Sequence, residues 1–169
     1  MCGIAGWVSY HRDLNDHRDT LLKMTKTMSL RGPDAEGLWI DGHIGLGHRR
    51  LAIIDLAGGT QPMLAHDGDQ VIAALTYSGE VYNFMELRGE LAARGHFFKT
   101  RSDTEVVLLA YLEWGEEMVD HLNGMYAFVA VDLTNGEFLA ARDPFGVKPL
   151  YVMQSGNGWC RKGSNRTRN

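Results

Sequence analysis

An Asn-Gly turn between two apolar runs constrains the fold of this chain more than any other feature. Residues 125–133 (MYAFVAVDL) and 137–143 (EFLAARD) flank the segment Thr134-Asn135-Gly136. An Asn-Gly pair between apolar runs is the strongest short-range signal for a β-hairpin, because both residues adopt positive φ angles readily. The sequence therefore predicts an antiparallel strand pair in its C-terminal part.

Other short apolar segments have the length and composition of strands. The run VIAALTY at 71–77 is typical of a strand covered on both faces. The segment from 56 to 69 contains a Gly-Gly pair and a proline, and is predicted to be a loop. Further strands are expected over 2–8, 37–40, 43–48, 50–55 and 149–153.

The helical segments are grouped rather than alternating strictly with strands. Asn83 with Glu86, and Ser102 with Glu105, match the capping-box pattern of a helix N-terminus. This grouping favours two packed sheets with helices outside them over a doubly wound parallel sheet. Helices are expected over 17–30, 83–95, 102–115 and 116–122.

Composition limits the classes of function. The 169 residues fit one domain, and 44% hydrophobic with 22% charged residues is ordinary for a globular protein. A net charge of −4 does not favour nucleic acid as the main partner. The chain shows neither a signal-peptide pattern nor an apolar stretch long enough to span a membrane. We therefore expect a cytoplasmic protein that binds neither nucleic acid nor membranes.

Cysteine usage and charge distribution add two expectations. The two cysteines lie at opposite ends with no CxxC pair, which argues against a disulfide framework and a structural zinc site. We predict no metal. Residues 154–169 carry four basic and no acidic side chains, which leaves 1–153 with 13 basic and 21 acidic ones. We expect one domain over 2–153 and a basic, disordered tail over 154–169.

Cys2 directly follows the initiator methionine and precedes Gly3. If Met1 is removed, Cys2 carries a thiol and a free α-amine. The amine titrates near ~7.7–8, so part of it can accept the thiol proton at neutral pH. The thiolate is the working nucleophile, and an N-terminal cysteine thus brings its own base. The alternative for this dipeptide alone is an inert cysteine at a frayed terminus.

Seven segments, in order and spanning 2 to about 152, share one family pattern. The segments are MCGIAG, RGPDAEG (31–37), RRLAIID (49–55), YSGEVYN (77–83), TRSDTEV (100–106), LNGMYAFVAVD (122–132) and ARDPFGVKPLY (141–151). They resemble the glutaminase domain of class II glutamine amidotransferases, and among these enzymes the chain is most similar to the glutamine-hydrolysing asparagine synthetases. The resemblance implies an α+β fold, a four-layer α/β/β/α sandwich of the N-terminal nucleophile hydrolase type.

The resemblance also implies a glutamine site. Arg50 matches the family arginine that grips the α-carboxylate of glutamine, a task that suits a guanidinium fork. The backbone around Leu51, Ile53 and Ile54 lines the same site in the family. Asp103 matches the acid that binds the α-ammonium group, and it is also a carboxylate favoured by the N-terminal dipole of a helix.

Ser78-Gly79-Glu80 departs from the family triplet Asn-Gly-Glu. In the family, the Asn side chain and the Gly N–H stabilise the tetrahedral oxyanion. Gly79 keeps its N–H, and the Ser78 hydroxyl can donate one hydrogen bond. The oxyanion hole is therefore intact, water-assisted or weakened. Arg31 and Asp34 of the RGPD segment are interpreted as fixing a loop near the site.

The sequence has no phosphate-binding motif of the ATP-binding synthetase domain that follows in the family. We interpret the chain as a glutaminase domain truncated before the synthetase domain. The glutaminase domain is expected to need no cofactor, because ATP and Mg²⁺ bind to the synthetase domain in the family. The predicted activity is hydrolysis of L-glutamine to L-glutamate and ammonia through a Cys2 thioester. The expected partner is either a separate synthetase subunit or a second copy. The alternative is a weakly active or non-catalytic regulatory fragment. A third interpretation, a nucleic-acid-binding protein with a basic tail, is supported only by the four basic residues of that tail.

Overall fold

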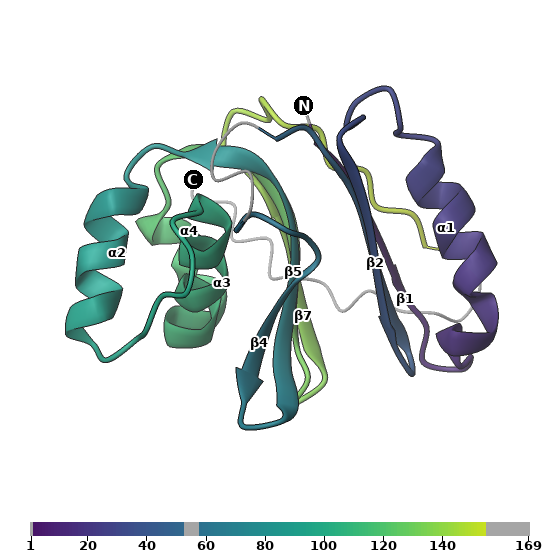
Figure 1. The fold of residues 1–169 in the computed structure, drawn as a ribbon, viewed down its shortest axis with the longest axis horizontal. Helices are drawn as coiled ribbons and strands as arrows, with labels where there is room; N and C mark the ends of the chain where they lie inside the picture. The colour runs from purple at the N-terminus through teal and green to yellow at the C-terminus, as the bar shows by residue number, and fades with distance from the viewer. Residues whose placement is uncertain (1, 53–57, 155–169) are drawn as a thin grey trace, which may run out of the picture.

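Two β-sheets pack face to face between outer layers of helix (Figure 1). The structure is a computed structural model that describes residues 2–52 and 58–154. One outer layer is helix α1, and the other contains helices α2, α3 and α4. The predicted α+β, four-layer α/β/β/α architecture is confirmed.

The first sheet has three antiparallel strands in the order β1-β3-β2: β1 (Gly3–Val8), β2 (Ala35–Asp41) and β3 (Ile44–Arg50). A 3₁₀ turn, η1 (Leu14–His17), leads into helix α1 (Arg18–Lys26), which packs on the outer face of this sheet. Gly47 allows this close packing, because a Cβ atom there would collide with the side chain of Thr25.

The second sheet has four antiparallel strands in the order β4-β5-β6-β7. Its strands are β4 (Met63–Asp67), β5 (Gln70–Val81), β6 (Gly124–Asp132) and β7 (Glu137–Arg142). Its outer face is covered by α2 (Phe84–Ala93), α3 (Asp103–Trp114), a 3₁₀ turn η2 (Gly115–Glu117) and α4 (Met118–His121).

The hydrophobic core has two parts, one on each face of the second sheet. The larger part lies between this sheet and its helices and includes Leu75, Leu91, Val107 and Phe128. The smaller part lies between the two sheets and contains Ile44, Leu46, Ala74 and Val131. Burial on both faces explains why the middle of β5 reads as a continuous apolar run.

The hairpin prediction is confirmed, since β6 and β7 pair in register from Ala127↔Arg142 to Asp132↔Glu137. The capping predictions are confirmed only in part. The Ser102 side chain accepts a hydrogen bond from the Thr104 N–H and caps α3. The Asn83 side chain instead bonds the backbone of the segment before β6, so the predicted capping box at α2 is wrong.

Three expected elements differ in the structure. Strand β4 lies inside the predicted loop 56–69, because Met63 and its neighbours pair with the start of β5. Residues 149–153 form no strand, and Tyr151 is 92% exposed there. Strand β3 ends at Arg50, whereas a separate strand was expected over 50–55. Residues 53–55 of that expectation lie outside the described residues.

Within residues 2–52 and 58–154, no helix is both long and apolar enough to cross a membrane.

Candidate active site

The Cys2 thiol lies beside the backbone of Leu51. Strand β1 pairs with β3 from Gly3↔Arg49 onward, which brings Cys2 to the end of β3. The Leu51 N–H donates to the Cys2 Sγ at 3.3 Å, and the thiol approaches the Leu51 carbonyl oxygen at 3.6 Å. These two contacts hold the Cys2 side chain against the end of β3.

The RGPD segment fixes the backbone that holds the thiol. The Asp34 N–H donates to the carbonyl oxygen of Arg50 at 3.0 Å. The Asp34 carboxylate accepts from the Ala52 N–H at 2.8 Å, so it holds the chain on both sides of Leu51. Asp34 therefore has the loop-fixing role predicted from the sequence.

Ser78 of β5 reaches across to the other sheet. Its hydroxyl donates to the carbonyl oxygen of Cys2 at 3.0 Å, and the side chain is buried. A hydroxyl has one proton to donate, so this bond occupies the donor that was assigned to the oxyanion. The structure thus brings Ser78 and Cys2 together, with the Ser78 hydroxyl bonded to the nucleophile's own backbone.

Gly79 has no room for a side chain and turns its N–H away from β6. A Cβ atom there would collide with the backbone of Met125 and Tyr126. Gly79 lies opposite Tyr126, whose N–H and carbonyl both bond Asp143 on the far side. In an antiparallel ladder the opposed Gly79 N–H therefore faces the other edge of β5.

The two neighbouring N–H groups on that edge are already bonded. The Tyr77 N–H donates to the side-chain oxygen of Gln61 at 2.6 Å, and the Val81 N–H points to Asp103 Oδ2 at 3.5 Å. The Gly79 N–H lies between them, beyond the end of β4, and the described residues provide it with no acceptor. On this edge of β5 the Gly79 N–H is therefore left between two N–H groups that are already bonded.

Asp103 begins helix α3 and is 6% exposed. Its Oδ2 accepts a hydrogen bond from the Tyr77 hydroxyl at 2.8 Å. Burial raises the pKa of this carboxyl, although the bonds from Tyr77 and Val81 work against that shift, and the nearby Glu80 carboxylate raises the pKa further. Burial and the Asp103 charge likewise raise the pKa of Tyr77 well above its ordinary value. Two adjacent acids at this edge suit a cationic group.

Arg50 lies at the end of β3, on the same face as His48, and is 9% exposed. Burial and the Arg50 charge lower the pKa of His48 to about 4, so the imidazole is neutral at pH 7. The β1–β3 pairing ends at Gly3↔Arg49, so Cys2 and Arg50 are the residues that come next beyond this pair. The structure thus brings Cys2, Arg50, Leu51 and Ser78 to one end of the space between the sheets. The predicted site residues Ile53 and Ile54 lie outside the described residues.

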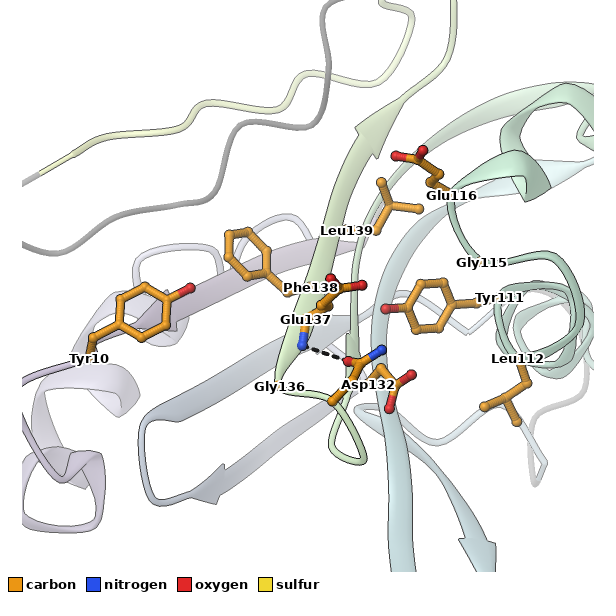
Figure 2. Close-up of a pocket in the computed structure, with 11 residues that line it drawn as sticks. Tyr10, Tyr111, Leu112, Gly115, Glu116, Asp132, Gly136, Glu137, Phe138 and Leu139 are labelled. Atoms are coloured by element: carbon orange, nitrogen blue, oxygen red, sulfur yellow. Dashed lines mark hydrogen bonds between the residues drawn. The ribbon is translucent and has the colours of Figure 1, made fainter.

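A separate cavity of about 560 Å³ opens at the opposite end of β6 and contains none of the predicted site residues (Figure 2). Asp132, Glu137 and Tyr111 line it. Ser78 lies opposite Ala127, five residues from Asp132, or about 17 Å along the strand. This cavity is therefore distinct from the Cys2 site.

Sequence reasoning did not single out His48, Thr76 or Asp143. Thr76 and His48 could have been noticed because each is a polar residue within an otherwise apolar strand segment. Asp143 is buried and accepts from the N–H groups of Tyr126, Val147 and Lys148, which fixes the turn after β7. Among the described residues, no three His, Cys, Asp or Glu side chains gather as metal ligands would.

The chain matches the family of glutamine amidotransferase domains over residues 1–167. It is 46% identical over 160 residues to the glutamine-hydrolysing asparagine synthetase 3 of Bacillus subtilis, covering 94% of this chain and 26% of that protein. It is 42% identical over 164 residues to the glutamine-hydrolysing asparagine synthetase of Asparagus officinalis, covering 97% of this chain and 26% of that one. The chain thus spans about a quarter of the length of these curated relatives.

Two solved structures share the fold. Glutamine phosphoribosylpyrophosphate amidotransferase of Bacillus subtilis superposes with a TM-score of 0.57 at 28% identity, covering 70% of this chain and 27% of that one. An allosteric regulatory enzyme of purine biosynthesis gives a TM-score of 0.51 at 29% identity, covering 63% and 25%. With the sandwich and the Cys2 site described above, these matches show that the chain belongs to the family of class II glutamine amidotransferase domains.

Proposed function

We propose that this chain hydrolyses L-glutamine to L-glutamate and ammonia through a thioester on Cys2. The observation that carries the proposal is the position of Cys2. Its thiol accepts a hydrogen bond from the Leu51 N–H, and its carbonyl oxygen accepts one from Ser78, the neighbour of Gly79 in β5. Acyl transfer needs a nucleophile and donors to the oxyanion, and these contacts bring the Cys2 thiol to the part of the molecule that carries the Gly79 N–H.

The reaction has two halves. Once Met1 is removed, the Cys2 α-amine accepts the thiol proton, and the sulfur attacks the γ-carbonyl carbon of glutamine. The oxyanion of the tetrahedral intermediate accepts from the Gly79 N–H. The C–N bond breaks, the ammonium of Cys2 returns its proton to the leaving nitrogen, and ammonia departs. Water then attacks the thioester and releases glutamate, which restores the thiol.

The site residues have complementary charges for a zwitterionic substrate. We assign the α-carboxylate of glutamine to Arg50 and its α-ammonium to Asp103, with Glu80 adding negative charge. The backbone of Leu51, Ile53 and Ile54 is assigned to the wall of the site. This arrangement favours glutamine over a substrate that lacks either charge.

The acceptor of the ammonia is proposed to lie on a synthetase partner, with ATP and Mg²⁺ bound there. The relatives that match this chain are about four times its length and are named asparagine synthetases. After β7 the chain exposes several large apolar side chains in succession, with Phe145 92% exposed. Such a run is typical of an interaction surface, and we propose that it contacts the synthetase partner. We propose the cytoplasm as the location of both proteins.

A weakly active regulatory fragment is the second candidate. The observation that favours it is the Ser78 hydroxyl, whose proton is bonded to the Cys2 carbonyl oxygen. Ser78 then adds no donor to the Gly79 N–H at the oxyanion. Removal of one oxyanion donor elsewhere costs roughly 10²–10³ in kcat, and a loss of that size would leave a weakly active chain.

A glutaminase assay with an intact-mass measurement tests the proposal. We expect glutamate release only from protein that has lost Met1. Cys2→Ala and Cys2→Ser should abolish it, while the matched control Cys160→Ser should retain the parent rate. A chloroketone analogue of glutamine should alkylate Cys2 and leave Cys160 free. Glutamate release by Cys2→Ala at the parent rate would disprove the thioester, and absence of release from the parent without Met1 would favour the regulatory fragment.

A further inference from the structure

The two halves of the proposed site come from different sheets. Cys2 directly precedes β1 and Leu51 directly follows β3 of the first sheet, whereas Gly79 belongs to β5 of the second. The distance from the nucleophile to the oxyanion donor therefore depends on how the sheets are held against each other. A misplacement of about 1 Å in such a geometry can cost roughly 10²-fold in rate.

A buried polar bridge joins the sheets beside this site. The His48 Nδ1 of β3 lies 3.2 Å from the Thr76 Oγ1 of β5, and the Thr76 hydroxyl donates to the Gly47 carbonyl oxygen at 3.2 Å. His48 is 1% exposed, and Thr76 is fully buried. The apolar contacts between the sheets, which include Leu46 and Val131, contribute packing without a directional bond.

The hydrogen-bond directions follow from the donors available. A carbonyl oxygen only accepts, so the single hydroxyl proton of Thr76 goes to Gly47. The Thr76 oxygen then accepts from the His48 Nδ1–H, and the neutral imidazole carries its proton on Nδ1. The buried Nε2 is left as an acceptor with no donor among the described residues. Leaving the buried Nε2 without a hydrogen bond is unfavourable. That the ring is nevertheless buried here, with its Nδ1–H bonded to Thr76, indicates a role for this one bond.

The bridge lies next to the catalytic groups on both strands. His48 is two residues from Arg50 and three from Leu51, while Thr76 is two residues from Ser78 and three from Gly79. In a strand, residues two apart share a face, so the bridge and the Ser78–Cys2 bond are consecutive polar ties across the same interface.

We propose that His48 and Thr76 are positioning residues, whose hydrogen bond sets the registry of the two sheets and thereby the placement of the Gly79 N–H relative to the Cys2 thiol. This inference rests on the proposed glutaminase function for its kinetic consequence, but the registry itself can be observed without turnover.

The kinetic arm compares variants that remove or keep the bond. His48→Phe keeps a buried ring without the donor, and Thr76→Val keeps the shape without the hydroxyl. Each should lower kcat for glutamine at least ten-fold with KM within two-fold, and the double variant should be no worse than the poorer single one. His48→Asn and Thr76→Ser, which keep the donor and the hydroxyl, should recover kcat to within three-fold of the parent.

The matched control is Val131→Ala, which removes packing between the same two sheets without touching the bridge. It should lower the melting temperature and leave kcat near the parent value. If His48→Phe and Thr76→Val lower kcat no more than Val131→Ala does, the positioning role is overturned. Failure of the Asn and Ser variants to recover kcat would also count against it.

The spectroscopic arm needs no turnover. In ¹⁵N spectra, the His48 ring of the parent should show a protonated Nδ1 and an unprotonated Nε2 at pH 7. The amide resonances of Leu51 and Gly79 should shift in His48→Phe and return in His48→Asn. A protonated Nε2, or unmoved amide resonances, overturns the inference. If the parent releases no glutamate, the proposed function fails, and these resonances still decide whether the bridge sets the registry.

Discussion

The Ser78 hydroxyl donates to the carbonyl oxygen of Cys2 at 3.0 Å, and this bond crosses from β5 of one sheet to the residue before β1 of the other. It fixes the backbone that carries both the thiol and the nitrogen proposed as its base. The bond also occupies the single hydroxyl proton of Ser78. Ser78 is therefore placed to orient Cys2, and we propose the Gly79 N–H as the donor to the oxyanion.

Replacement of Ser78 by Ala tests this arrangement. We expect kcat for glutamine to fall by less than ten-fold with KM unchanged, because orientation is weakened while the Gly79 donor is kept. Steady-state kinetics measure both constants. Ser78→Asn, which restores the family residue, should match or exceed the parent rate. A loss of 10²–10³-fold in Ser78→Ala would instead mean that the hydroxyl turns to the oxyanion in the transition state.

Removal of the Asp34 carboxylate should loosen the backbone beside the thiol. Asp34→Ala leaves the Ala52 N–H without its acceptor. We expect slower alkylation of Cys2 by the chloroketone analogue and a three- to ten-fold lower kcat, with about 1–2 kcal/mol less stability. Asp34→Asn keeps an acceptor oxygen and should lie close to the parent in all three measurements. Equal alkylation rates for Asp34→Ala and the parent would contradict the role of this loop.

Local patterns in the sequence predicted much of the fold. The hairpin at Asn135-Gly136 depends on turn chemistry within a few residues, and it appears as expected. Ser102 also caps its helix as predicted, because the bond to Thr104 is local. Features of this kind can be read from sequence because both partners lie close together in the chain.

Features that depend on distant partners could not be read in the same way. Strand β4 exists because Met63 meets Leu75 of β5, although its flanking residues resemble a loop. The Asn83 side chain bonds residues 121 and 123, a tertiary contact that replaced the predicted local cap. The same reason applies at the site. Cys2 was predicted as the nucleophile, but its contacts with Leu51 and Ser78 come from strands far apart in sequence.

Asp103 should govern glutamine binding more than the chemical step. We expect Asp103→Asn to raise KM for glutamine at least ten-fold, because the α-ammonium loses its counter-charge, with a smaller change in kcat. Because burial raises the pKa of Asp103, the neutral amide should not lower the melting temperature at neutral pH. Tyr77→Phe, which removes only the hydroxyl bonded to Asp103, is the matched control and should affect KM less. An unchanged KM in Asp103→Asn would exclude this assignment.

His48 should make the protein less stable in mild acid. Its pKa is about 4 in the folded state against an ordinary 6.5, so between these values the unfolded chain binds more protons. The stability that the neutral ring contributes is present above pH 6.5 and is lost as pH falls towards 4. The full shift corresponds to about 3 kcal/mol. Denaturant unfolding of the parent and His48→Asn from pH 7 to pH 4 should show a steeper loss for the parent; parallel curves would mean that His48 titrates normally.

Asp143 should be the main anchor of the apolar segment that follows β7. Burial alone would raise the pKa of its carboxyl, but the N–H groups of Lys148, Val147 and Tyr126 outweigh that effect and lower it. The stability from this carboxylate is therefore present above its ordinary pKa and is lost as pH falls through the lower folded value.

Asp143→Ala would remove the acceptor of the Tyr126, Val147 and Lys148 N–H groups. The Tyr126 and Lys148 bonds are buried, and an unsatisfied buried N–H typically costs about 1–3 kcal/mol. We expect a clear loss of unfolding free energy by denaturant titration. Hydrogen exchange of the Val147 and Lys148 amides should become faster. Glu137→Ala, at the opposite end of β7, is the control and should change neither exchange rate. Unchanged protection of Val147 in Asp143→Ala would mean that packing, and not this carboxylate, holds the turn that presents Phe145.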